Sequence, residues 1–267
     1  MCGFIFKSHL IKRNRSLNLK DLLLYQITKS YFLKIIIMAK LPALENFPKR
    51  TVDFLKKLSK NNSKEWFEAH RDEYNSQFLE PALQFVVEMG ERLSTIVPNI
   101  NAIPKIDKSI FRLHRDVRFS KDKSPYKTNL GLYFWEGKKK MDSPGFYFHV
   151  DPKGYFIASG IYMPQKEQLK IYRDAVSDNI KGKELSDAVK KVTKKGNYLL
   201  GGKKYKKVPK GYDPESKYAD FLLHEGFYMY KEGNDINKLP QKDLIGYVFQ
   251  SFKDLLPIHK WLVKTLG

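Results

Sequence analysis

The sequence predicts an α+β fold in which an antiparallel β-meander of four or more strands packs with N-terminal and C-terminal helices. Apolar residues recur at helical spacing from about Lys49 to Ile96, and after Pro104 the period changes from 3.6 to 2. At least four strand-like segments then follow with short connections, which favours antiparallel neighbours. Helical spacing returns after Pro164, so helices flank a block of strands and do not alternate with them.

Two helical segments are expected before the strands. The segment TVDFLKKLSK (51–60) has apolar residues at helical spacing, and the NNS turn that follows it ends the helix. The serine of that turn can cap a second helix, which covers about residues 63–96. Trp66 and Phe67 in its first turn are expected to anchor it in the core. Pro81 either interrupts this helix or separates two abutting helices.

Four segments show the alternation expected of strands that bury one face. They are IFRLHRDVRF (110–119), TNLGLYFWEG (128–137), FYFHV (146–150) and YFIASGIYM (155–163). The turn SKDKSPY joins the first two, and the residues DPKG join the last two, since Pro and Gly suit a four-residue hairpin turn. Connections as short as these predict a meander.

Helical spacing after the strands predicts three further helices, at residues 165–179, 182–195 and 243–266. Pro257 could break the last of them. Residues 198–214 suggest a short strand and a loop, and residues 217–230 suggest a helix to about His224 followed by a strand. The chain shows no internal repeat and no long linker, so residues 38–267 are expected to form a single α+β domain.

The first 37 residues differ in composition from the rest. They contain seven Lys or Arg residues and one acidic residue, Asp21. We expect a leader that is disordered or not part of the native start, with Met38 as the true first residue; an organelle transit peptide is the alternative. The apolar runs are too short for a membrane span, and none is expected. The single cysteine, Cys2, excludes an internal disulfide and fits a reducing, cytoplasmic compartment.

Positive charge dominates the composition and concentrates in one motif. The formal net charge of +20 attracts polyanions, although solubility is a simpler explanation for many of the lysines. In FRLHRDVRFSKDKSPYKTN (111–129), six side chains are Arg or Lys and only two are acidic. Strand alternation places four charged or titratable side chains on the polar face: Arg112, His114, Asp116 and Arg118. Arg115 falls on the apolar face, where it needs a bulge or a buried partner.

This motif predicts a site for a small anion near the end of the first strand. Arg donates to phosphate or carboxylate through two parallel N–H groups, and Lys adds charge. The expected ligand-binding residues are Arg112, Arg115, Arg118, Lys123, Tyr126, Lys127, Tyr147 and His149. The candidates for a catalytic role, if the protein is an enzyme, are His149, His114 and Asp116, since histidine can transfer protons near neutral pH.

Two alternatives stay open at this point. The cations could form a ladder of surface ion pairs with Asp107, Asp116 and Asp122, each pair worth only about 0–1 kcal/mol. The protein could instead bind nucleic acid through the same strand face and the tract 181–210, which contains eleven lysines and two acidic residues. No metal site and no cofactor is expected, because the sequence lacks HExxH, GxGxxG, GxxxxGK[ST] and CxxC patterns.

Five motifs together resemble the uncharacterised family known as domain of unknown function 2461. They are NNSKEWF (61–67), FRLHRDVRFSKDKSPYKTN (111–129), PGFYFHV (144–150), GIYMP (160–164) and VPKGYDP (208–214). The longest motif fits the family pattern, an Arg followed by RD-x-RFS-x-DK-x-PYK, without departure from Arg112 to Lys127. The resemblance covers about Phe47 to Val263. It implies a cytoplasmic-type soluble domain and no assigned activity.

Overall fold

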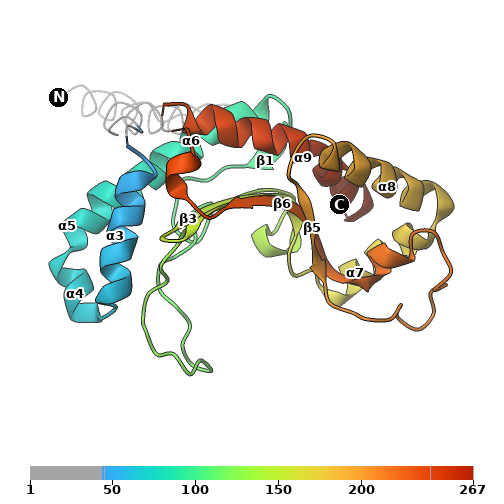
Figure 1. Cartoon of the computed structure of the whole chain (residues 1–267), viewed down its shortest axis with the longest axis horizontal. Helices are drawn as coiled ribbons and strands as arrows, with labels where there is room; N and C mark the ends of the chain where they lie inside the picture. The colour runs from blue at the N-terminus through green and yellow to red at the C-terminus, as the bar shows by residue number, and fades with distance from the viewer. Residues whose placement is uncertain (1–43, 45, 241, 267) are drawn as a thin grey trace, which may run out of the picture. The chain divides into compact units, whose positions relative to one another are not determined.

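An antiparallel β-sheet forms the centre of the fold (Figure 1). A computed structural model describes residues 44, 46–240 and 242–266, which belong to one unit, residues 42–267. In this part of the chain the sheet has six strands in the order β1-β2-β3-β4-β6-β5, each antiparallel to its neighbours. The strands are β1 (Ile100–Asn101), β2 (Leu130–Glu136), β3 (Gly145–Asp151), β4 (Gly154–Ile161), β5 (Leu199–Lys203) and β6 (His224–Gly233).

Helices precede and follow the strands. Within the described residues they are α3 (Lys49–Lys60), α4 (Lys64–Ala69), α5 (Arg71–Tyr74), α6 (Glu80–Ser94), α7 (Lys166–Ser177), α8 (Asn179–Thr193) and α9 (Leu244–Leu266). A π-helical turn, Asn75–Leu79, joins α5 to α6, and 3₁₀ turns cover Lys140–Asp142, Ala219–Leu223 and Ile236–Lys238. The predicted α+β class, with a meander between N-terminal and C-terminal helices, is confirmed.

One face of the sheet contains the hydrophobic core. Phe146 and Phe148 of β3 are buried on this face, because alternate residues of a strand point to the same side. The helix α9 runs along this face (Figure 1), and its Phe252 ring lies 5.0 Å from that of Phe146. Phe85 of α6 lies 5.2 Å from Phe148. The residues that alternate with them along the strands point to the opposite face, which we call the open face. The candidate site lies on the open face.

The N-terminal helices follow local signals in the sequence. Ser63 precedes α4 and caps it, because its hydroxyl accepts a hydrogen bond from the Trp66 backbone N–H at 3.2 Å. Pro81 lies in the first turn of α6, where a helix does not need the N–H that proline lacks. The segment 63–96 is therefore a series of abutting helices, which is one of the two expected arrangements.

Three expectations about secondary structure need correction. Residues 110–119 do not form a strand, for reasons given below. The helix expected before His224 is only a 3₁₀ turn, Ala219–Leu223. Pro257 does not break α9, because Leu255 and Ile258 on either side of it are buried in the core and packing outweighs the lost hydrogen bond.

The expectations for residues 1–37, a leader or a transit peptide, fall outside the described residues. The domain boundary at Met38 falls there as well and stays a prediction. Among the described helices, none has the length and apolar character needed to cross a membrane.

Candidate functional site

The charged motif lies in a two-armed ribbon, residues 109–133, that extends from the sheet (Figure 1). Backbone hydrogen bonds join Ser109 to Tyr133, Phe111 to Gly131, Leu113 to Lys127 and Arg115 to Pro125. From the bond between Phe111 and Gly131 to the bond between Leu113 and Lys127, the first arm spans two residues and the second arm spans four. The second arm therefore contains a bulge. The bulge and the missing N–H of Pro125 interrupt the ladder. The strand expected at residues 110–119 therefore does not form.

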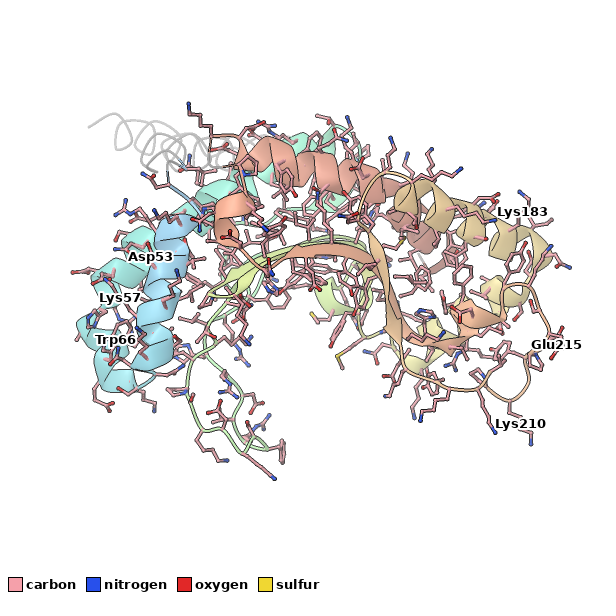
Figure 2. All side chains as sticks on the ribbon, in the orientation of Figure 1. Asp53, Lys57, Trp66, Lys183, Lys210 and Glu215 are labelled. Carbon is pink, nitrogen blue, oxygen red and sulfur yellow. The ribbon has the colours of Figure 1, made fainter. Side chains whose placement is uncertain are left out.

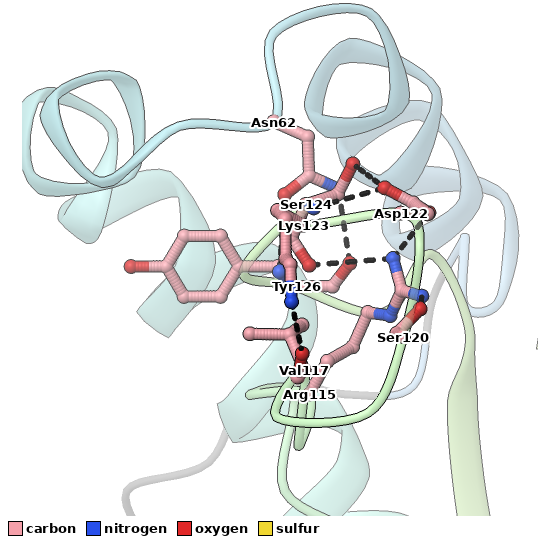
Figure 3. Close-up of polar contacts among 8 residues, drawn as sticks. All are labelled: Asn62, Arg115, Val117, Ser120, Asp122, Lys123, Ser124 and Tyr126. Atoms are coloured by element: carbon pink, nitrogen blue, oxygen red, sulfur yellow. Dashed lines mark hydrogen bonds and ion pairs between the residues drawn. The ribbon is translucent and has the colours of Figure 1, made fainter.

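The second arm of the ribbon is anchored to the N-terminal helices (Figure 3). The Asn62 side chain donates to the Tyr126 carbonyl at 2.9 Å and accepts from the Tyr126 N–H at 3.0 Å, so it pairs as a neighbouring strand would. The Tyr126 ring is only 3% exposed and stacks on Phe67 with ring centroids 4.3 Å apart. The His114 ring packs edge-on against the Tyr126 ring, with the two ring centroids 4.9 Å apart. Tyr126 and His114 therefore contribute to this anchor.

Arg115, which alternation placed on the apolar face, finds its partner across the turn (Figure 3). Its guanidinium pairs with the Asp122 carboxylate and lies 3.3 Å from the Ser124 carbonyl oxygen. Hydrogen bonds from Ser124 and from Arg115 hold the pKa of Asp122 well below its usual range. Arg115 thus has a carboxylate partner as expected, but that partner is exposed and not buried.

The tip of the ribbon faces solvent. Arg118 is 77% exposed at its side chain and pairs with Asp116 through two hydrogen bonds, at 2.7 and 3.0 Å. Lys123 donates to the Val117 carbonyl at 3.0 Å. Phe119 is 95% exposed, which corrects the expectation that alternation would bury it. The pattern fails here because the tip has no neighbouring strand or core to turn toward.

A hollow of about 730 Å³ lies on the open face of the sheet at the base of the ribbon. Its floor is formed by strand residues, mainly Tyr133, Tyr147, His149, Phe156, Ala158 and Tyr228. Its rim is formed by Phe111, Lys127 and Asn129 of the ribbon and by Met141, Tyr162 and Met163 of the connections between elements. The bulged arm thus brings a lysine and an asparagine to an otherwise largely aromatic site.

Two lysines, which we call the rim lysines, flank Phe111. The Nζ atoms of Lys127 and Lys140 lie 5.9 and 3.7 Å from the centroid of its ring. Burial lowers the pKa of both ammonium groups, that of Lys140 to about 8, and the charge of Arg112 further lowers that of Lys127. In the part of the chain that the structure describes, neither lysine forms an ion pair with a carboxylate. An anion would therefore stabilise both charges.

The floor offers one hydrogen-bond donor and one acceptor. The Nδ1 atom of His149 lies 3.2 Å from the Tyr147 hydroxyl, and its Nε2 atom lies 3.6 Å from the Asp151 carboxylate. Burial lowers the pKa of His149 below 6.5, although Asp151 opposes the shift. Burial also raises the pKa of Tyr147. These shifts favour the neutral imidazole and the protonated phenol, which already face each other in the floor.

The geometry does not assemble a metal site. His114 packs in the anchor, whereas His149 lies in the floor of the hollow. Within residues 44, 46–240 and 242–266, no group of three or more His, Cys, Asp or Glu side chains could hold a metal ion.

Residues 50–261 match the model of a family described as conserved hypothetical protein (DUF2461). The chain belongs to DUF2461. The resemblance predicted from the five motifs is thereby confirmed. No curated protein and no solved structure matches the chain.

In this DUF2461 chain, the structure brings together only part of the predicted site. Three of the predicted ligand-binding residues line the hollow: Lys127, Tyr147 and His149. Arg112 is not in the lining, but it is close enough to lower the pKa of Lys127. The other four are placed elsewhere on the ribbon, in ion pairs, backbone contacts or the anchor: Arg115, Arg118, Lys123 and Tyr126. Two catalytic candidates, His114 and Asp116, are also outside the lining.

Sequence analysis missed several residues of the hollow in this DUF2461 chain. The alternation that placed Tyr147 on the open face also places Phe156 and Tyr228 there, once β4 and β6 are in register with β3. That signal was available in the sequence. Lys140, which lies beside Phe111 and outside the lining, had no such signal, because it is in a 3₁₀ turn between strands.

The lysine-rich tract 181–210 lies on different elements, namely α8, β5 and the loop that follows. Figure 2 labels Lys183 on α8 and Lys210 in the loop. Some of its charges are already compensated: Lys183 forms an i,i+4 ion pair at 2.7 Å, and Lys204 pairs with Glu225 at 2.6 Å. These pairs reduce the charge that the tract could offer to a polyanion.

Proposed function

We propose that the protein binds a small anionic ligand, phosphorylated or carboxylated, in the hollow on the open face. Lys127 lines the hollow and supplies the nearest charge, and Lys140 and Arg112 add to the positive potential. Tyr147 and His149 contact the ligand from the floor. The main support is that a hollow of about 730 Å³ has the partly buried Lys127 in its lining and a second partly buried lysine, Lys140, beside Phe111 of its rim, neither paired with a carboxylate in the described residues.

The rim lysines are better anion ligands than the arginines of the ribbon tip. A partly desolvated ammonium without a carboxylate has lost hydration, and its contact with the face of an aromatic ring replaces only part of that loss. A bound anion would supply the stronger interaction. Arg118 already has two hydrogen bonds to Asp116 and is exposed to solvent. Exchanging that carboxylate for a ligand in water would gain little free energy.

The form of the hollow supports a small ligand over a nucleic acid. Cavities of roughly 300–1,000 Å³ with mostly apolar walls and a few polar groups are typical of small-molecule sites. A nucleic-acid strand instead needs an extended basic groove. The hollow has an aromatic floor, and its lysine lies at the rim.

The floor pair determines what the site could do to a bound ligand. If the ligand is a substrate, His149 is the group that could accept a proton from it, and Asp151 orients the imidazole at 3.6 Å. The Tyr147 hydroxyl could donate a hydrogen bond or a proton. His114 and Asp116 have no part in this proposal, because they do not line the hollow.

A test compares two lysine variants of the same ribbon. Lys127→Met removes the charge in the lining, and Lys121→Met removes an exposed lysine outside the lining. Thermal-shift measurements with inorganic phosphate, sugar phosphates, nucleotides, small carboxylates and short oligonucleotides would identify a stabilising compound, and calorimetry would give its affinity. We expect at least one small anion to stabilise the protein, and we expect Lys127→Met to weaken its binding about tenfold or more.

Two results would contradict the proposal. Equal binding by the two variants would show that the hollow does not hold the anion. Stabilisation by oligonucleotides alone, with no response to any small anion, would favour the nucleic-acid alternative.

A further inference from the structure

We infer that the ligand carries a planar aromatic group beside its anionic group, so that the hollow takes an aryl phosphate or an aryl carboxylate. The inference rests on the proposed function, because it concerns the same hollow. Its basis is the shape of the floor, which depends on where glycines permit tyrosine rings to lie.

Two tyrosines of the floor lean across neighbouring strands. A Cβ atom added to Gly131 of β2 would lie 2.8 Å from the Tyr147 hydroxyl, so the Tyr147 side chain extends from β3 over β2. A Cβ atom added to Gly201 of β5 would overlap the Tyr228 ring, so that ring extends from β6 over β5. Only glycine allows a ring to approach the backbone so closely.

These directions leave only small residues of β4 between the two rings. Ala158 of β4 pairs with Tyr147, and Gly160 of β4 pairs with Tyr228. Since one tyrosine leans toward β2 and the other toward β5, both lean away from β4. The result is a trough with Ala158 and Gly160 at its bottom. Adjacent strands are about 4.8 Å apart, so the walls rise from strands about 10 Å apart. Ala158 is 5% exposed and lines the hollow between these walls.

Aromatic rings close one end of the trough. The rings of His149 and Phe156 are 5.7 Å apart and inclined at 21°, and those of Phe156 and Tyr230 are 4.9 Å apart at the same inclination. This run of nearly parallel rings continues across three strands. A planar ligand ring can stack on or pack edge-on against such rings, which a saturated ring of equal size cannot do as well.

Phe111 connects the trough to the charge at the rim. Its ring centroid lies 6.0 Å from that of Tyr147 and 5.9 Å from the Nζ atom of Lys127. Lys127 and Ala158 line the same hollow, so a ligand whose aromatic group lies in the trough can extend its anionic group past Phe111 toward Lys127. An aryl phosphate or an aryl carboxylate is the smallest compound that combines the two groups.

The test compares flat and puckered ligands of similar size. We expect phenyl phosphate to bind the full-length protein about fivefold more tightly than cyclohexyl phosphate, and methyl phosphate to bind more weakly than either. Benzoate and cyclohexanecarboxylate make the same comparison for a carboxylate. Ala158→Leu would fill the trough from its bottom, and we expect this variant to lose the preference for the aryl ligand while circular dichroism shows an intact fold.

The outcomes separate this inference from the proposed function. Equal affinities for phenyl and cyclohexyl compounds, both reduced by Lys127→Met, would overturn the aromatic requirement and leave the anion site standing. An unchanged preference in a folded Ala158→Leu variant would show that the trough is not where the ring lies. No binding of these compounds, while another small anion binds and depends on Lys127, would overturn the inference and leave the anion site standing. If Ala158→Leu does not fold, Phe156→Leu tests the same stacking, and an unreduced preference for phenyl phosphate would overturn the inference.

Discussion

The anchor between Asn62 and Tyr126 provides the sharpest test of how the ribbon is held. We predict that Asn62→Ala lowers the free energy of unfolding by about 3 kcal/mol, because it leaves the N–H and the carbonyl of Tyr126 without partners. Each unsatisfied buried backbone group costs roughly 1–3 kcal/mol, and the Tyr126 side chain is 3% exposed, so water has limited access. For a domain of this size the loss corresponds to a fall in Tm of about 6–12 °C.

The adjacent asparagine is a matched control. Asn61 makes one exposed side-chain hydrogen bond, to the Lys57 carbonyl at 3.0 Å, so Asn61→Ala should cost no more than about 0.5 kcal/mol. Urea unfolding followed by circular dichroism measures both variants under the same conditions. If the two substitutions destabilise the protein equally, the pairing of Asn62 with the ribbon does not contribute to stability and the reasoning is wrong.

Two further predictions concern charge and burial. Affinity for phenyl phosphate should fall by up to about tenfold between pH 7 and pH 9, because burial lowers the pKa of Lys140 to about 8 and this lysine then loses the charge that a bound anion stabilises. Lys140→Arg should remove this dependence, since arginine stays protonated, and a fall that persists in this variant on calorimetric titration would contradict the role of Lys140. Phe119→Ser should change the free energy of unfolding by less than about 0.5 kcal/mol, whereas Phe148→Ala should lower it by about 3–5 kcal/mol. Similar losses for both on urea unfolding would show that Phe119 is packed in solution.

The central strands β2, β3 and β4 were predictable because each has a neighbour on both sides and a core beneath it. The short edge strand β1 was not predicted. In β3, the alternation of buried and less buried residues is the direct result of one face packing against α9. The hairpin between β3 and β4 also followed from its turn residues, since Asp151 accepts hydrogen bonds from the N–H groups of Lys153 and Gly154. Turn chemistry and one-sided burial both leave recognisable patterns in the sequence.

The ribbon shows where the same reasoning fails. Residues 110–119 alternate as well as β3 does, yet Phe119 is 95% exposed and Leu113 is buried. Alternation specifies a face only where a neighbouring element defines that face, and the ribbon leaves the sheet before Phe119 is reached. The bulge that ends the regular pairing depends on how two arms of unequal length are hydrogen-bonded to each other. A periodic pattern in one arm contains no information about that pairing.

The sequence by itself determined the family motif, the antiparallel sheet and the placement of Tyr147 and His149 on the face away from the core, because these depend on local turn chemistry and on a period of two. Only the tertiary structure decided which cations remain without a carboxylate. Arg115 and Arg118 are neutralised by carboxylates of the same ribbon, whereas Lys127 and Lys140 meet at Phe111 from separate segments of the chain. The choice of ion-pair partner depends on distances between side chains in space, and these are set by the folding of loops, which the order of charges does not specify.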